Sequence, residues 1–109
     1  MLAPLRVPTS GGGVLLDELI DLYLADGPRC LDGIAAALQR GDTERAARQA
    51  HQLKGSSANL SALRVRALCE TLEARAVAGS TAGLAEVLTA LRAAFEATAA
   101  SLGAERTPR

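Results

Sequence analysis

The single histidine and the single lysine of this chain stand three residues apart, in the run Ala50-His51-Gln52-Leu53-Lys54-Gly55-Ser56-Ser57. The other eleven of the twelve Lys and Arg residues are arginine, so a lone lysine beside a lone histidine indicates a specific role for this pair. Positions i and i+3 of a helix share a face. A neutral imidazole is available as a nucleophile near neutral pH. With an ammonium beside it and small residues after it, this imidazole suits an exposed nucleophile that carries a phosphoryl group.

A helix through this run buries the face opposite the histidine. At about 100° per residue, one apolar stripe collects Ala46, Ala50, Leu53, Ser57 and Leu60. His51 lies roughly 140° from the middle of that stripe by the same arithmetic. The spacing therefore predicts that the imidazole faces solvent.

The residues expected beside the imidazole also suit a site that another protein approaches. Ala47, Gly55 and Ala58 keep the surface low, so the active site of another protein can approach closely. Glycine inside a helix costs about 1 kcal/mol relative to alanine, which calls for a compensating reason at Gly55. Arg48 and Lys54 could offset the roughly −1.5 to −2 charge of a phosphoryl group. Each feature taken singly also fits ordinary solvated helix surface; their conjunction is what favours a site.

The composition predicts one all-α domain. The 109 residues suit a single domain, and nearly half are hydrophobic, with alanine dominant. Good helix formers are abundant, whereas aromatic residues are limited to Tyr23 and Phe95. Twelve acidic and twelve basic side chains cancel, which disfavours nucleic acid as a partner.

The expected location is the cytoplasm. No apolar run approaches the ~20 residues of a membrane span, and Pro4 and Pro8 interrupt any signal peptide. The two cysteines, Cys30 and Cys69, have neither CxxC nor metal-ligand spacing, so we expect free thiols rather than a disulfide or a metal site.

The order of breakers and apolar stripes predicts an antiparallel up-down four-helix bundle with an extra short N-terminal helix. Residues 1–13 are expected to be a flexible leader, 14–102 the bundle and 103–109 a frayed tail. Asp26-Gly27-Pro28 is expected to break the chain between its first two helices, because proline suits a first helical turn. The expected helices are 14–25, 28–40, 43–59, 62–77 and 82–102, and the short loops between them imply antiparallel neighbours. The starting methionine and loose termini favour a free-standing protein, with monomer as the default.

The run from Ala50 to Ala62 resembles the signature of histidine-containing phosphotransfer (HPt) domains, roughly AHxLKGxSxxxGA. The segment 68–73, Leu-Cys-Glu-Thr-Leu-Glu, is similar to the LCxxLE segment of that family. Residues 19–24 look like its first bundle helix and residues 38–42 like its turn before the histidine helix, so the resemblance covers about 14–102. One departure is Ser61, where the family usually has glycine; a left-handed backbone there would strain a serine.

The resemblance implies a four-helix bundle in which His51 is phosphorylated through Nε2. It implies that Lys54 stabilises the phosphoryl group and that Gly55 leaves room for the partner. The expected partners are response-regulator receiver domains and a hybrid sensor histidine kinase. The receiver would supply the Mg²⁺, so the chain would be a phosphoryl carrier with no cofactor, metal or ATP site of its own, and not an enzyme. The residues expected to contact the partner are Ala47, Arg48, Gln52, Gly55 and Ala58.

Two other functions stay open at this point. A module of the same fold could dock on a receiver or a kinase and inhibit it without phosphoryl transfer, and sequence hardly separates that function because it uses the same surface. Retention of both His51 and Lys54 favours transfer. A hydrolase or metal protein is disfavoured, since one histidine and no histidine–carboxylate cluster of recognisable spacing are present.

Overall fold

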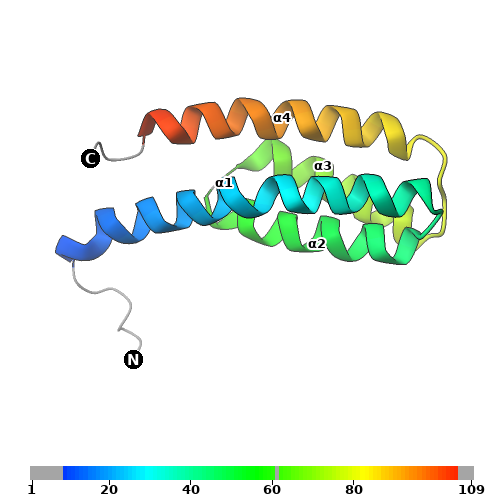
Figure 1. The fold of residues 1–109 in the computed structure, drawn as a ribbon, viewed down its shortest axis with the longest axis horizontal. Coiled ribbons are helices and arrows are strands. Elements are labelled where there is room, and N and C mark those ends of the chain that lie inside the picture. The colour runs from blue at the N-terminus through cyan, green and yellow to red at the C-terminus, as the bar shows by residue number, and fades with distance from the viewer. Residues whose placement is uncertain (1–8, 61, 106–109) are drawn as a thin grey trace.

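Four helices make up the computed structural model, which describes residues 9–60 and 62–105, with side chains from 16 to 60 and from 62 to 104. Helix α1 spans Thr9–Gln39, α2 Thr43–Asn59, α3 Leu63–Val77 and α4 Leu84–Glu105. Each helix packs against the next, and α1 also contacts α4, so the up-down bundle is closed (Figure 1). No strand occurs among these residues, which confirms the predicted all-α bundle. None of their helices is long and apolar enough to cross a membrane.

The predicted break at Asp26-Gly27-Pro28 is wrong, because α1 runs through Pro28 without interruption. Proline inside a helix removes one hydrogen bond and crowds the carbonyl four residues earlier, at about 3 kcal/mol. Burial on both sides outweighs this cost: Ile20 and Tyr23 before the proline, and Ile34 after it, all lie in the same core. The extra short N-terminal helix is therefore the first part of a single 31-residue helix.

The ends of the bundle also differ from the sequence-based boundaries. Helix α1 begins at Thr9, inside the expected leader, and α4 continues to Glu105, inside the expected tail. Residues 1–8 and 106–109 lie outside the described residues, as does Ser61, where the departure from the HPt signature falls.

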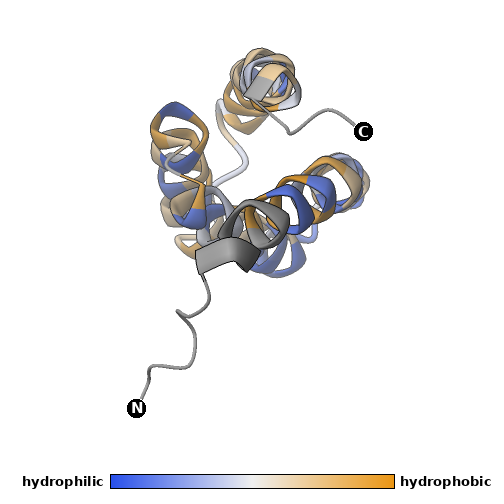
Figure 2. Cartoon of the chain, turned by 90° about the vertical axis from the view of Figure 1, so that its left-hand side faces the viewer, coloured by the Kyte–Doolittle hydropathy of each residue, from blue (hydrophilic) through white to orange (hydrophobic). Residues whose placement is uncertain are grey.

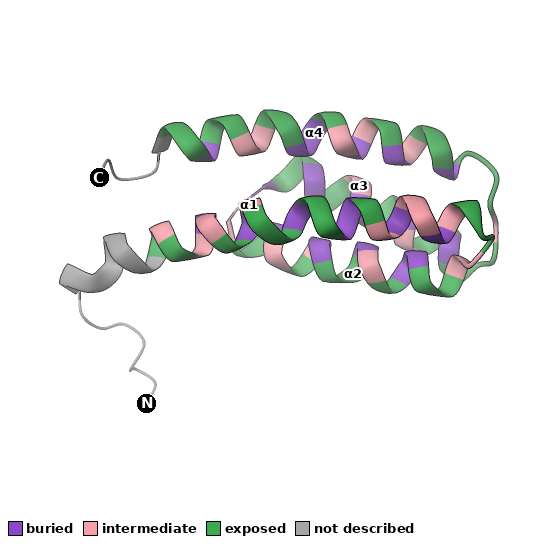
Figure 3. Cartoon of the chain, in the orientation of Figure 1, coloured by how far each residue is buried: buried purple, intermediate pink, exposed green. Residues whose placement is uncertain are grey.

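The core is built from alanine and aliphatic side chains with one aromatic pair. Viewed from one end, all four helices carry hydrophobic residues and surround a common interior (Figure 2). Buried positions of α4 recur along the edge that faces the other helices (Figure 3). The ring centroids of Tyr23 and Phe95 lie 5.1 Å apart, and this aromatic pair joins α1 to α4. The Tyr23 hydroxyl is 2.8 Å from the Ser57 hydroxyl, and this buried hydrogen bond joins α1 to α2.

The start of α2 is fixed by local chemistry. Gly41 has φ +70°, a left-handed conformation that glycine adopts without strain. The Asp42 carboxylate then accepts a hydrogen bond from the Arg45 backbone N–H at 3.1 Å, which caps the helix. This cap fixes where α2, the helix that carries His51, begins.

Candidate functional site

His51 lies on the outer face of α2. The buried residues of this helix are Ala46, Ala47, Ala50, Leu53 and Ser57, and the His51 side chain is 67% exposed. The stripe expected from the sequence is thus the core face, with Leu60 half-buried at its end. The prediction of an outward imidazole is confirmed.

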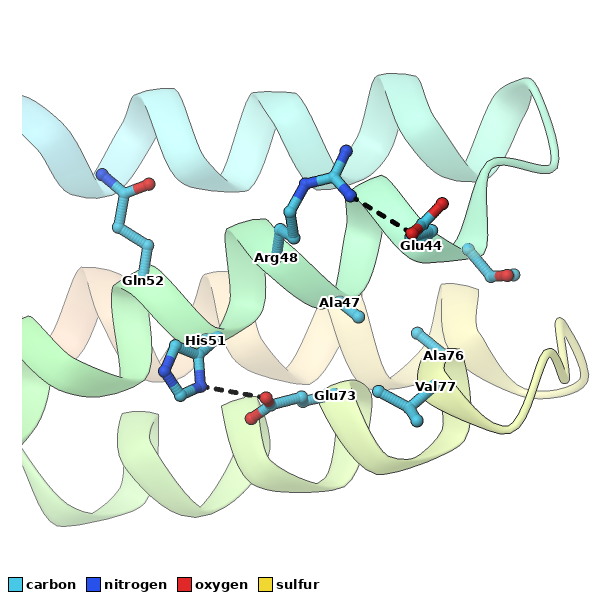
Figure 4. A pocket seen from close by; sticks show the side chains of 9 residues that line it. Glu44, Ala47, Arg48, His51, Gln52, Glu73, Ala76 and Val77 are labelled. Atoms are coloured by element: carbon cyan, nitrogen blue, oxygen red, sulfur yellow. Dashed lines mark hydrogen bonds and ion pairs between the residues drawn. The ribbon is translucent and has the colours of Figure 1, made fainter.

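Glu73 of α3 holds one nitrogen of the imidazole. His51 Nδ1 lies 2.9 Å from Glu73 Oε2, across the α2–α3 interface (Figure 4). An ionised carboxylate can only accept a hydrogen bond, so the ring donates from Nδ1–H. In a neutral ring this leaves the lone pair on Nε2, which points away from Glu73. The contact selects the tautomer in which the outer nitrogen keeps its lone pair.

Glu73 is also the partner of Lys54. The Lys54 ammonium donates to Glu73 Oε1 at 2.8 Å, with the two side chains 26% and 22% exposed. The Lys54 hydrogen bond and the weaker one from His51 hold the pKa of Glu73 below its usual value, although burial opposes them. Glu73 is therefore ionised at neutral pH. Lys54 sits on the Nδ1 side of the ring, bound to the carboxylate, and not at the nitrogen where the resemblance implies that it stabilises a phosphoryl group.

A hollow of about 960 Å³ opens beside the imidazole (Figure 4). It lies between the first half of α2 and the end of α3, and its lining residues are Thr43, Glu44, Ala47, Arg48, His51, Gln52, Glu73, Ala76 and Val77. Three of the five residues expected to contact a partner, Ala47, Arg48 and Gln52, share this hollow with His51. Ala47, which was expected on the outer face beside the imidazole, is instead a core residue that is only 7% exposed, although it lines the hollow.

Arg48 is held only loosely. Its guanidinium is 3.7 Å from the Glu44 carboxylate, one helical turn earlier, and the two side chains are 63% and 86% exposed. Exposed pairs of this kind contribute little, typically below about 1 kcal/mol. The Arg48 side chain can therefore leave Glu44 for an anionic group on an incoming molecule.

Gly55 and Ala58 lie outside the hollow and are exposed on α2. A Cβ added at Gly55 would meet nothing within 4 Å. Packing within the chain therefore does not require glycine here, yet glycine costs a helix about 1 kcal/mol. Nothing inside the bundle accounts for the glycine.

Glu73 is the site residue that the sequence reasoning missed. It closes the segment 68–73, which carries part of the HPt resemblance, but no role follows from that segment alone. Glu73 is 22 residues from His51 and on another helix, so only the pairing of α2 with α3 brings the two side chains together. Only the structure shows that one oxygen of Glu73 binds Lys54 and the other binds His51.

The two thiols are buried in the core and do not line the hollow at His51. Cys30 and Cys69 are free and buried, and burial raises the pKa of the Cys69 thiol to about 12. Across the part of the chain that the structure describes, no three His, Cys, Asp or Glu side chains lie close enough to hold a metal ion.

Comparisons with known proteins identify the family of this chain. The Hpt domain family matches residues 18–104. Histidine-containing phosphotransfer protein 4 of Arabidopsis thaliana is 37% identical over 70 residues, which cover 62% of this chain and 55% of that protein. This chain thus matches about half the length of that curated relative. No solved structure matches significantly. With a match over most of its length, and with its one histidine presented from the second helix of a four-helix bundle, the chain belongs to the Hpt domain family.

Proposed function

We propose that this chain is a phosphorelay intermediate that accepts a phosphoryl group on His51 Nε2 from one receiver domain and donates it to another. The observation that carries the proposal is the 2.9 Å contact between His51 Nδ1 and Glu73, which leaves an exposed Nε2 with a free lone pair. Members of the Hpt family are phosphoryl carriers rather than conventional enzymes. In this proposal the receiver brings the Mg²⁺ and the aspartate, and a hybrid sensor histidine kinase stands upstream.

The proposed transfer moves no proton on this chain. The Nε2 lone pair attacks the phosphorus of an aspartyl phosphate, the P–O bond breaks, and its electron pair stays on the aspartate carboxylate. The ring already carries Nδ1–H, so it becomes a phosphoimidazolium. In the return step the N–P electrons go back to Nε2 and the neutral ring is restored. Glu73 stabilises the ring most when the ring is cationic, because a full positive charge then lies directly against the ionised carboxylate.

The proposed docking surface extends beyond the hollow at His51. A standard protein interface covers about 800 Å² on each partner. On the other side of α2, a hollow of about 190 Å³ lies against α1, with Ser56 and Asn59 on its α2 wall. Leu22 of α1, 58% exposed, borders it. The low surface at Gly55 lies between the two hollows, so one receiver could cover both.

The two free, buried thiols are usual for the reducing cytoplasm, and the proposal includes that location. The direct test is intact mass after incubation with phosphoramidate, with His51→Gln as the control. A single acid-labile phosphoryl adduct on the wild type alone, followed by its loss to a purified receiver with Mg²⁺, is the expected result. A folded wild type that forms no adduct but still binds a receiver would replace the proposal with an inhibitory docking module.

A further inference from the structure

One buried hydrogen bond joins the first part of α1 to the helix that carries His51. The Tyr23 and Ser57 hydroxyls lie 2.8 Å apart, and the two residues are 2% and 0% exposed. Apart from this pair, the buried residues in the part of the chain that the structure describes are apolar. Polar pairs in apolar cores are best known for fixing how helices align, because a slipped alignment would leave a buried hydroxyl without a partner.

The first part of α1 depends on such a contact because Pro28 separates it from the rest of the helix. Proline has no N–H, so the helix lacks the hydrogen bond from position 28 to the carbonyl of Leu24. The part of α1 after Pro28 leads directly into the turn at Gly41 and the start of α2. Residues 16–27, which we call the arm, lie on the far side of Pro28 from that turn, so contacts across the bundle have to hold them over α2.

The arm carries the α1 share of the proposed docking surface. Leu22, which is 58% exposed, precedes Tyr23 in the chain, and both residues border the hollow of about 190 Å³ between α1 and α2. Ser56 and Asn59 lie on the α2 wall of this hollow, on either side of Ser57 in the sequence. The hydroxyl pair thus joins the two helices that form the hollow, so a change in this contact would move one wall relative to the other.

The arm is also held from the α4 side, but by a less directional contact. The rings of Tyr23 and Phe95 are tilted by 46°, and Gly27 lies under the same Phe95 ring. Aromatic pairs are stable over a range of centroid distances, about 4.5–7 Å. A hydrogen bond, in contrast, weakens steeply when its angle falls below about 120°. The hydroxyl pair is therefore the contact that fixes the position of the arm along α2.

We propose that Tyr23 and Ser57 are positioning residues for receiver docking, which hold the arm where Leu22 and His51 can contact one receiver together. The inference rests on the proposed function and deepens it, because it assigns part of the affinity for the receiver to a hydrogen bond inside the bundle. Glu73 holds the imidazole from α3, and neither hydroxyl contacts it. Loss of the hydroxyl pair should therefore weaken docking and leave the reactivity of His51 unchanged.

The test compares variants that remove the hydrogen bond with one that only destabilises the core. Tyr23→Phe removes one hydroxyl and keeps the ring beside Phe95, Ser57→Ala removes the other, and the double variant removes both. Leu88→Ala is the control, because it leaves a cavity in α4 about two helical turns before Phe95 and outside the α1–α2 interface. Circular dichroism and urea unfolding check that each protein is folded under the assay conditions.

Each protein is phosphorylated with phosphoramidate, and the adduct is measured by intact mass against time. Transfer is then followed at increasing concentrations of a purified receiver domain, with Mg²⁺, that accepts the phosphoryl group from the wild type. This design separates the KM for the receiver from the rate at saturating receiver. It also separates both quantities from the reactivity of His51 toward a small reagent.

We expect Tyr23→Phe and Ser57→Ala to raise the KM for the receiver severalfold, with the saturated rate and the phosphoramidate reaction unchanged. The double variant should match the more affected single variant, because both substitutions remove the same contact. Leu88→Ala should lose stability without a change in KM.

A folded Tyr23→Phe protein with the KM of the wild type would overturn the inference, and this variant decides the matter if Ser57→Ala does not fold. An equal rise in KM in Leu88→Ala would also overturn it, because the effect would then follow stability rather than the position of the arm. A wild type that forms no adduct, or that transfers to no receiver, would instead overturn the proposed function.

Discussion

At the scale of single residues, the site depends on one carboxylate that serves two partners. Glu73 fixes the tautomer of His51 and takes the charge of Lys54. The placement of His51 and Lys54 close together could be predicted from the sequence, because they are three residues apart and share a helix face. The placement of Glu73 could not, because twelve acidic residues are present and their distance from the imidazole depends on the packing of α3 against α2.

Replacing Glu73 by glutamine should slow phosphorylation of His51 by phosphoramidate about tenfold or more, the size of effect found for carboxylates that orient metal-binding histidines. The amide can still accept from Nδ1–H, but it cannot balance the imidazolium charge that develops at the ring. Rates measured by intact mass against time would test this, with Glu70→Gln, one turn away on α3 and paired with Arg66, expected to match the wild type. Equal rates for all three proteins would remove Glu73 from the mechanism.

The same carboxylate makes stability depend on pH. Its pKa in the folded protein lies below the usual 4.5, chiefly through Lys54, so the folded state binds this proton less readily than the unfolded chain does. The stabilisation is present above about pH 4.5 and is lost as the pH falls through the lowered value. In urea unfolding, the wild type should exceed Glu73→Gln at pH 7, and the difference should shrink at pH 3. A difference that persists unchanged at pH 3 would contradict this assignment.

At the scale of the helices, two glycines of similar sequence context have opposite structural roles. Gly27 of α1 lies under the Phe95 ring of α4, so an added Cβ would collide with the ring. Gly55 of α2 faces open space. Sequence alone could not assign these roles. It predicted a helix break at Gly27, and the contact that distinguishes Gly27 comes from a helix nearly seventy residues further along the chain.

Gly27→Ala is therefore expected to destabilise the bundle. Overpacking a core typically costs about 1–3 kcal/mol. Replacing glycine by alanine inside a helix gains about 1 kcal/mol, so most of the overpacking range exceeds this gain. Urea unfolding would measure the change, and Gly33→Ala, whose nearest neighbour is the flexible Gln49 side chain, is a milder comparison. A Gly27→Ala protein more stable than the wild type would show that Phe95 moves aside without cost.

Gly55→Ala should do the reverse and stabilise the protein by up to about 1 kcal/mol, because the helix gains propensity and nothing is displaced. Phosphorylation by phosphoramidate should be unchanged, since that reagent is small. Transfer to a receiver should be slower if the partner surface comes as close to α2 as we propose. Unchanged transfer between the proteins would place the docked receiver further from Gly55.

At the scale of the whole molecule, the bundle was predictable and the course of its first helix was not. Helix-forming composition, amphipathic stripes and short connections were enough for an all-α, up-down architecture. The break expected at Pro28 was wrong because burial of Ile20, Tyr23 and Ile34 in one core outweighs the local cost of a proline inside the helix. That burial is a property of the assembled bundle, and local sequence rules do not include it.

The closed core also shields both thiols. Cys30 and Cys69 are at most 4% exposed, and burial raises the pKa of both, that of Cys69 to about 12. A thiol reagent at pH 8 should therefore label neither cysteine in the native protein and both after unfolding in urea, with labelling counted by mass. Rapid labelling of the folded protein would indicate frequent opening of the bundle.

The pairing of His51 with Glu73 also bears on how the protein folds. These residues belong to consecutive helices and are 22 positions apart, whereas the Arg92–Asp32 ion pair between α4 and α1 spans 60 positions. Bringing distant segments together carries a larger loop-closure entropy, so contacts between sequence neighbours tend to form earlier. The α2–α3 hairpin can then assemble the imidazole and its carboxylate before α4 closes the bundle, and we expect substitutions in α4 to affect unfolding rates more than the geometry of His51.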